Sequence, residues 1–357
     1  MGISGLLQGV PVAVDDTISV KGQPCLCRSK ILEGYVSPYD ATVVARLREA
    51  GAVITNVGDT YDALNVSRDT GGDICHKATL WGRVGLKPSY GRVSRYGMLP
   101  YASSMNQAGA IGKTVKDVAV LLQVMAGHDP LDAMSADVPV PDYGKALQGG
   151  MKGLRIGVPK EYFADGADAE IVRAAIDGCA KAGAEVVEVS LPHTEYALAV
   201  YTIISAAEAS TNLACLDGVR YGHRTKAHVN SAADLFSKSR GEGFDADMKR
   251  DIILGTYLLS KECYEEYFVR AQKVRTLIRR DFEEAFKVCD VMMAPVTFSA
   301  FPALSLAGIC ALSVPCGKTQ EGEPLGLHIL GPAFGEERIL QAGQSVEDWS
   351  KGGTPTE

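Results

Sequence analysis

Short apolar runs alternate with helix-length amphipathic segments along most of this chain. The clearest unit has an apolar run over 154–158, an amphipathic stretch over 167–182 that stops at Gly183, and a second apolar run over 185–189. Apolar positions at a helical period predict a helix, and glycine is the residue that most often follows a helix end. The pattern therefore predicts a strand–helix–strand unit, which is typical of an α/β fold with helices covering a sheet.

An earlier unit has the same form. It begins with a strand over 9–14 and continues with a helix that Asp40 caps and that runs through Arg48. Gly51 is expected to end this helix, and the next strand starts over 52–54. Aspartate at the first position and glycine after the last are ordinary helix boundaries.

The C-terminal half predicts long helices followed by buried strands. The Asp- and Pro-rich segment 129–143 is interpreted as a surface excursion, so residues 1–357 are expected to form a single domain. Helices are expected over 196–216, 254–288 and 336–348, and buried strands over 290–295, 311–315 and 325–330.

Composition narrows the class of protein without choosing a function. Hydrophobic residues make up 46% and charged residues 22% of the 357, which is ordinary for a soluble globular chain. A formal net charge of −7 argues against a surface that coats nucleic acid. Nine cysteines without framework spacing, and no hydrophobic leader, predict free thiols and a cytoplasmic location. No apolar run is long enough to cross a membrane, and no cysteine–histidine spacing indicates a metal site.

One turn stands out chemically. Asp69 and Thr70 precede two adjacent glycines, Gly71 and Gly72, and Asp73 follows them. Paired glycines let the main chain turn sharply and present N–H groups to a ligand, as in an oxyanion hole beside a nucleophile. Asp73 is an anion and would repel an oxyanion. The turn therefore indicates an active site whose nucleophile has been replaced.

The same turn and the segment 85–97 that follows it carry a family resemblance. Together they resemble the amidase signature family, and within it the branch formed by the A subunits of the glutamyl-tRNA(Gln) amidotransferases. Further matching segments occur in family order at 38–44, 217–222, 272–278 and 313–317.

The resemblance implies a fold, an activity and partners. The fold is an α/β/α sandwich around a mixed, largely parallel sheet, here truncated at the N-terminus and missing internal segments. The activity is amide hydrolysis by a Ser–Ser–Lys triad, which in the amidotransferase branch releases ammonia from glutamine. A partner subunit then uses ATP and Mg²⁺ to amidate mischarged tRNA. The chain is accordingly expected to bind no cofactor itself, to join partner subunits in a hetero-oligomer, to meet tRNA only through them, and to bind no membrane.

Carried over by position, the implied chemistry is mostly missing. Asp15 stands where the family has its lysine, and Asp73 stands where it has the nucleophilic serine. The bridging serine belongs to a segment that is expected to be deleted between Ile54 and Asp69. The oxyanion turn, Thr70, Gly71 and Gly72, is retained.

The substrate-binding positions are also altered. Asp251 takes the place of an arginine that would grip the glutamine carboxylate, whereas Tyr201 matches a substrate-contacting tyrosine. A second deletion is expected between Val296 and Phe301. An aspartate would repel the carboxylate that an arginine binds in bidentate fashion.

Three interpretations follow. The chain is a catalytically dead or severely impaired protein of the A-subunit type, or it is a non-catalytic paralogue that binds or regulates the amidotransferase complex. The third is a small-amide hydrolase with altered carboxylate chemistry, in which Asp15 and Asp73, with Asp16 or Asp69, hold Mg²⁺ or Ca²⁺. Acidic residues near a loop more often serve only to solvate it, so this third interpretation is the least favoured and no metal ligand is assigned.

Overall fold

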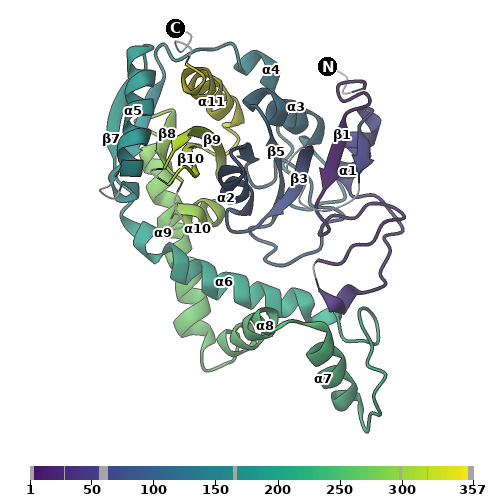
Figure 1. Ribbon diagram of the computed structural model, residues 1–357. Helices are drawn as coiled ribbons and strands as arrows, with labels where there is room; N and C mark the ends of the chain where they lie inside the picture. The colour runs from purple at the N-terminus through teal and green to yellow at the C-terminus, as the bar shows by residue number, and fades with distance from the viewer. Residues whose placement is uncertain are drawn as a thin grey trace.

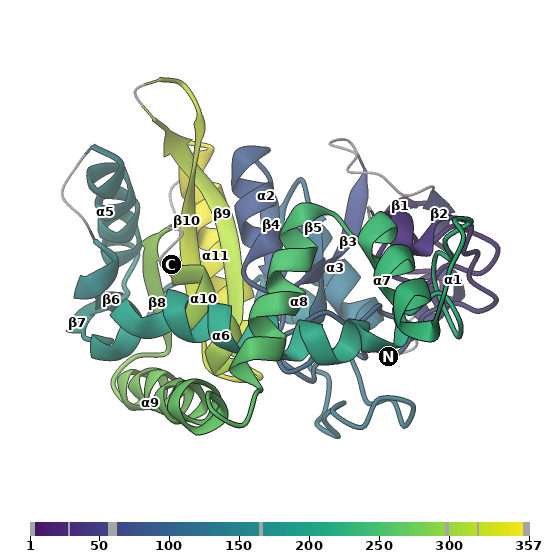
Figure 2. The same ribbon diagram turned by 90° about the horizontal axis from the view of Figure 1, so that it is seen from below.

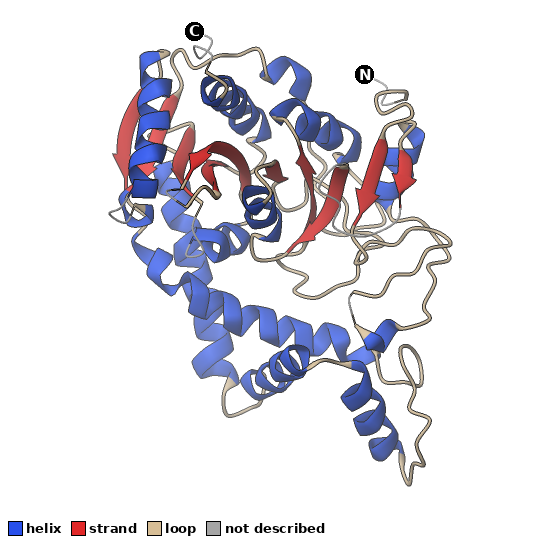
Figure 3. Ribbon diagram, in the orientation of Figure 1, coloured by secondary structure: helices blue, strands red, loops and turns tan. Residues whose placement is uncertain are grey.

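A ten-stranded mixed sheet runs through the computed structural model, which describes residues 4–27, 29–55, 63–163, 167–296, 300–319 and 321–352. The strand order is β2-β1-β3-β5-β4-β9-β10-β8-β6-β7 (Figures 1 and 3). The strands are β1 (Pro11–Val14), β2 (Val53–Thr55), β3 (Leu64–Asp69), β4 (Val84–Lys87), β5 (Gln107–Gly112), β6 (Arg155–Pro159), β7 (Glu185–Val189), β8 (Val291–Pro295), β9 (Cys310–Lys318) and β10 (Pro324–Gly331).

Parallel pairing occurs at the two ends of the sheet. Strand β1 pairs in parallel with β2 and β3, and β6 pairs in parallel with β7 and β8. The strands between these ends are joined by antiparallel pairs. The expected α/β/α sandwich around a mixed sheet is confirmed.

Helices cover both faces of the sheet. The helices of the described residues are α1 (Thr42–Glu49), α2 (Asp73–Leu80), α3 (Val115–Met125), α4 (Tyr143–Ala146), α5 (Ala167–Lys181), α6 (Ala197–Asn212), α7 (Ala232–Gly243), α8 (Ala246–Leu258), α9 (Arg270–Ala285), α10 (Ala300–Ala307) and α11 (Glu336–Ser350). Helix α8 packs on α6 and helix α7 on the segment Lys30–Leu32, away from the sheet (Figure 1). Figures 1 and 2 show α3 and α11 on one side of the sheet and α6, α9 and α10 on the other.

Strand β8 contributes side chains to the hydrophobic cores on both faces of the sheet. Val291 and Met293 pack into the core beneath α3, α5 and α11, whereas Met292 and Ala294 pack into the core beneath α6, α9 and α10. Successive strand side chains point to opposite faces, so a strand covered on both sides must be apolar throughout. This explains why the apolar run near 290–295 predicts a buried strand correctly.

The structure differs from the pattern in three places. Ala41, without a side-chain hydrogen bond, is the N-cap of α1, because Asp40 accepts from the Lys21 N–H and from Arg48 instead. The single helix expected over 254–288 is broken into α8, a π-helical segment (Tyr264–Val269) and α9. Apolar residues continue through the break, so periodicity alone does not reveal it.

The segment 129–143 is the third difference. It is a loop that lies mostly at the surface, as expected, but its carboxylates Asp129 and Asp132 are buried and anchor it to the rest of the fold. The nine cysteines are free, as expected. Among the described residues, no helix is both long enough and apolar enough to cross a bilayer.

Candidate functional site

The turn between β3 and α2 lies beside a cleft. Gly72 is the N-cap of α2 with a φ of 101°, a left-handed conformation that side chains rarely adopt. A Cβ on Gly72 would lie 2.4 Å from the Phe301 Cβ, and one on Gly71 would lie 2.6 Å from the Tyr201 hydroxyl. The paired glycines are therefore required by the backbone and by the close approach of two aromatic side chains.

Asp69 holds the turn from inside. Its carboxylate is fully buried and accepts the N–H groups of Gly72 at 3.1 Å and Ile74 at 3.0 Å. Burial, together with the negative charge of Asp73, raises the pKa of the Asp69 carboxyl to about 6, although the Lys87 ammonium and the two amides oppose this. Asp69 is thus a structural carboxylate in an unfavourable electrostatic environment.

Asp73 is the first residue of α2 and is exposed. Its Oδ2 accepts the Thr70 N–H at 3.2 Å. Two amides of the turn, those of Thr70 and Gly72, are therefore already bonded to carboxylates of the turn itself. An oxyanion would have to displace an anion in order to reach them.

The cleft in front of this turn has a volume of about 900 Å³. Its apolar wall comes from α6, α10 and the turn before α6, and its polar wall includes Asp73 and His76 of α2. The lining residues are Gly71, Gly72, Asp73, His76, Glu161, Pro192, Thr194, Glu195, Leu198, Tyr201, Phe301 and Pro302. Such a volume accommodates a small organic ligand.

Tyr201 reaches this cleft from α6. Its hydroxyl lies against Gly71, and burial raises the pKa of its phenol, with Asp73 and Asp69 adding to the shift. The structure thus brings together five of the positions that the sequence indicated: Thr70, Gly71, Gly72, Asp73 and Tyr201.

Asp15 lies outside the lining of the cleft, at the end of β1. Its Oδ1 accepts the Thr17 N–H at 3.0 Å and the Thr17 hydroxyl at 2.6 Å. Its Oδ2 lies 4.0 Å from the Nζ of Lys77, which is one helical turn beyond Asp73 on α2. The position that the family resemblance assigns to a lysine thus holds Asp15, and Lys77 of α2 lies beside Asp15. Lys77 lies four residues after Asp73, so the two share one face of α2, and this spacing is the sequence signal that could have pointed to Lys77.

Asp251 of α8 also lies apart from the cleft lining. Its carboxylate accepts the hydroxyl of Tyr101, a loop residue, at 2.8 Å. Arg68 lies 5.9 Å from the centre of the Tyr101 ring and donates to the Leu99 carbonyl at 3.1 Å. Asp251 therefore binds a tyrosine that links the helical layer to the loop before β5.

The carboxylates do not gather into a cation site. In the described ranges, no group of three or more His, Cys, Asp or Glu side chains is placed to hold a metal ion. Asp15 is bonded to Thr17 and Asp69 to the amides of its own turn. These contacts give no support to the hypothesis that Asp15, Asp73 and either Asp16 or Asp69 bind Mg²⁺ or Ca²⁺.

Sequence reasoning misses a buried pair behind the cleft. The Phe301 ring lies between His76, at 5.9 Å between ring centres, and His328, at 5.4 Å. His328 of β10 and Ser313 of β9 are opposite each other in the strand register, and both are fully buried. Neither His328 ring nitrogen nor the Ser313 hydroxyl has a hydrogen-bond partner among the described residues. Only the strand pairing brings these two residues together.

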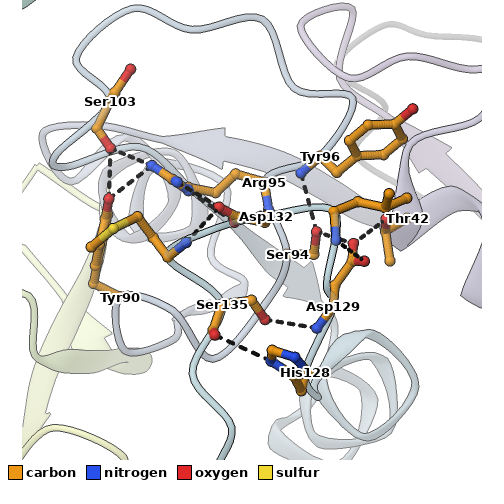
Figure 4. A network of polar contacts seen from close by, with 12 residues as sticks. Thr42, Tyr90, Ser94, Arg95, Tyr96, Ser103, His128, Asp129, Asp132 and Ser135 are labelled. Carbon is orange, nitrogen blue, oxygen red and sulfur yellow. Dashed lines mark hydrogen bonds and ion pairs between the residues drawn. The ribbon is translucent and has the colours of Figure 1, made fainter.

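A second polar network fixes the loop that supports the turn (Figure 4). Asp132 accepts two hydrogen bonds from the Arg95 guanidinium, at 2.6 and 3.0 Å, and Arg95 also donates to the Ser103 carbonyl at 2.7 Å. Further along this loop, Asn106 is hydrogen-bonded to the Thr70 side chain at 2.8 Å. The loop that contains Arg95 and Asn106 therefore contacts both Asp132 and the turn at Thr70.

This fold and this glycine turn define the class of protein. The family model for amidases matches residues 2–61 and 57–305, which is most of the chain. The chain belongs to the amidase family. The two matched segments meet at 57–61, the region where the first internal deletion is expected. Residues 56–62, like residues 297–299 at the second expected deletion, lie outside the described part of the structure.

The chain is similar to the A subunit of glutamyl-tRNA(Gln) amidotransferase from several bacteria. It is 43% identical to that of Geobacter metallireducens over 405 aligned positions, covering 96% of this chain and 83% of the relative. It is 43% identical to that of Methylacidiphilum infernorum, covering 97% and 84%. An alignment longer than the chain itself means that these relatives contain internal stretches with no counterpart here.

Solved structures agree on the fold. The A subunit of the Thermotoga maritima glutamyl-tRNA(Gln) amidotransferase superposes with a TM-score of 0.77 at 28% identity, covering 96% of this chain and 84% of that one. The peptide amidase of Stenotrophomonas maltophilia superposes with a TM-score of 0.80 at 24% identity, covering 98% and 84%. The second likeness concerns the fold alone.

Proposed function

We propose that this chain is a protein of the amidotransferase A-subunit type whose amide-hydrolysing centre is inactive or severely impaired. The proposal rests above all on Asp73, an exposed carboxylate at the start of α2, bonded to the Thr70 amide where a nucleophile would stand. The relatives named as A subunits support the family role, which is glutamine amide hydrolysis that supplies ammonia for the conversion of Glu-tRNA(Gln) to Gln-tRNA(Gln).

Loss of the nucleophile has a large kinetic consequence. A carboxylate that attacked an amide would form an acyl anhydride from a poor electrophile, whereas a serine activated by a neutral lysine forms a stable ester. Removing the nucleophile of a serine hydrolase lowers the rate by several orders of magnitude and leaves roughly 10³–10⁴-fold over water from the oxyanion hole and binding. The position expected for the base offers no remedy, because Asp15 already accepts two hydrogen bonds from Thr17.

The retained scaffold supports a binding role in the amidotransferase complex. Helix α8 and the π-helical segment expose large apolar side chains, among them Ile253 at 70% and Tyr257 at 58%, with Tyr264 and Tyr267 nearby in sequence. Contiguous exposed apolar surface is typical of protein contact sites, and the proposal takes these side chains to form one such patch. In this role the chain is a non-catalytic partner or regulator of the other subunits. Those subunits use ATP and Mg²⁺ and contact the tRNA.

A paired measurement tests the proposal. Ammonia release from glutamine is measured with the purified full chain, alone and with the other subunits of a bacterial amidotransferase, while co-purification measures association. We expect no release above that of Asp73→Ala, together with association of the subunits. Release that depends on Asp73 would instead support a small-amide hydrolase, and absence of association would remove the binding role.

A further inference from the structure

The cleft of about 900 Å³ at the glycine turn is lined by negative charge. This is unexpected, because the family resemblance places a substrate with a carboxylate there. Asp73, Glu161 and Glu195 line the cleft, and none of the described lining residues is a lysine or arginine. We propose that the cleft binds an organic cation: a primary amine or amidine attached to an apolar or aromatic body. This inference rests on the proposed function, because it takes the cleft to be the altered substrate site.

The cavity itself is the basis of the proposal, and its charge selects the class of ligand. The volume lies within the range of small-molecule sites, which is roughly 300–1,000 Å³. Leu198, Phe301 and Pro302 give the cleft apolar lining in addition to its carboxylates. Such a wall takes up the hydrocarbon part of a ligand, and the phenyl face of Phe301 or the ring of Tyr201 also attracts a cation.

Two of the carboxylates are fixed in place. The Glu161 carboxylate accepts the Ser190 hydroxyl at 2.5 Å and the Leu191 N–H at 2.9 Å. Burial alone would raise its pKa, but these hydrogen bonds outweigh burial and lower it, which keeps Glu161 ionised. Asp73 is oriented by the Thr70 N–H. A carboxylate has about four lone-pair sites, so each can accept further hydrogen bonds from an ammonium group.

Two cations near the described part of the cleft, Lys77 and Arg68, have other partners. The Lys77 ammonium lies 4.0 Å from Asp15, and the Arg68 guanidinium donates to the Leu99 carbonyl. Beneath the turn, burial and then the charge of Asp73 raise the pKa of Asp69, while the Lys87 ammonium opposes them, so Asp73 adds negative charge at this end of the cleft. The lining offers a ligand carboxylate no lysine or arginine, only donors such as His76, whereas an ammonium ion would be stabilised by the carboxylates.

Three probes of similar shape test this. Benzylammonium, benzyl alcohol and benzoate are titrated into the full chain by calorimetry at low salt, and the benzylammonium titration is repeated at high salt. We expect benzylammonium to bind about tenfold or more tightly than benzyl alcohol, with benzoate weakest, and added salt to reduce the difference. Benzoate that binds as well as benzylammonium, or no preference between the cation and the alcohol, would overturn the proposal.

Variants locate the effect. Asp73→Asn keeps an oxygen for the Thr70 amide, and Glu195→Gln keeps side-chain length. Each is expected to weaken benzylammonium several-fold while leaving benzyl alcohol unchanged. Glu188→Gln is the matched control, since Glu188 is exposed on β7 and is not among the residues that line the cleft. Equal losses in all three variants would place the cation on the general surface and contradict the proposal.

The ligand preference of the cleft and its amide-hydrolysing activity are tested independently. Cation preference together with amide hydrolysis would overturn the impaired centre and leave the ligand class standing. No cation preference and no hydrolysis would overturn the ligand class alone.

Discussion

Two groups of aspartates in this molecule have opposite environments. In the segment 129–143, Asp129 and Asp132 are buried and bonded to several donors, including Ser94, Thr42 and Arg95. At the candidate site, Asp73 is exposed in a cleft and accepts one amide. The first group has partners that offset the cost of desolvation, whereas Asp73 keeps its hydration and faces space that a ligand can enter.

The pKa values record the same contrast. Burial alone would raise the pKa of Asp132, but hydrogen bonds from Arg95 outweigh it and hold the pKa at about 2. Near the cleft, burial and the charge of Asp73 raise the pKa of Asp69 to about 6. Asp132 is stabilised as an anion by several donors, whereas Asp73, which accepts one amide, adds negative charge next to the buried Asp69.

The largest expected effect is loss of stability in Asp132→Ala. The change leaves the half-buried Arg95 guanidinium without its ion pair, so we expect the free energy of unfolding to fall by about 3 kcal/mol. Urea unfolding at neutral pH measures it. Asp137→Ala, on the same segment but exposed, is the control and should change stability by less than about 0.5 kcal/mol. Equal effects of the two changes would mean that the network does not anchor the loop.

Gly72→Ala should follow, with a loss of about 2 kcal/mol or more. The added methyl requires a left-handed φ and also meets the Phe301 side chain. Gly322→Ala separates the two causes, because Gly322 has a φ of 88° with no atom within 4 Å of an added Cβ. If both variants lose the same amount in urea unfolding, the contact with Phe301 contributes nothing.

His328→Gln should change the acid dependence of stability. Burial, helped by Lys87, lowers the pKa of His328 to about 3, whereas the unfolded chain binds this proton near pH 6.5. The neutral imidazole therefore contributes stability above pH 6.5 that is lost as the pH falls toward 3. Relative to the variant, the wild type should lose about 2 kcal/mol between pH 7 and pH 5.

The comparison with the variant is needed because Asp69 acts in the opposite direction. Its folded pKa is raised, so its contribution is present below about pH 4 and is lost as the pH rises through about 6. Both proteins contain Asp69, so its contribution cancels when the free energies of unfolding of the two proteins, measured with urea at several pH values, are subtracted. A difference in stability that is independent of pH would contradict a neutral, buried His328.

Asp73→Asn should have the smallest effect on stability. Removing a charge from the first turn of α2 weakens its interaction with the helix dipole, but it also relieves repulsion of Asp69, so the net change should stay within about 0.5 kcal/mol. The same variant should lower the pKa of Asp69, which carbon-detected NMR titration can follow. An unchanged Asp69 pKa would mean that the two carboxylates do not interact.

The sequence predicts the scaffold better than the site. Strand β8 follows from an apolar run, because burial of a strand on both faces leaves a local signal. The turn at Gly71 and Gly72 is equally local. The pairing of Ser313 with His328, and the approach of Phe301 to Gly72, depend on strand register and helix packing between residues far apart in the chain. No short-range pattern encodes these contacts.

The contrast between Asp132 and Asp73 also shows what composition cannot decide. Both segments are acidic and rich in turn-forming residues, and the sequence favours a surface position for 129–143. Burial of Asp132 depends on Arg95, 37 positions away, and thus on tertiary structure.

Ammonia release from glutamine tests most directly whether the amide-hydrolysing centre is impaired. It is measured for the purified full chain and for its Asp73→Ala variant, each with the other amidotransferase subunits present, and an intact homologue of this chain serves as the positive control. We predict that both forms release no more ammonia than the mixture without them. Turnover by the wild-type chain that disappears in Asp73→Ala would contradict an impaired centre.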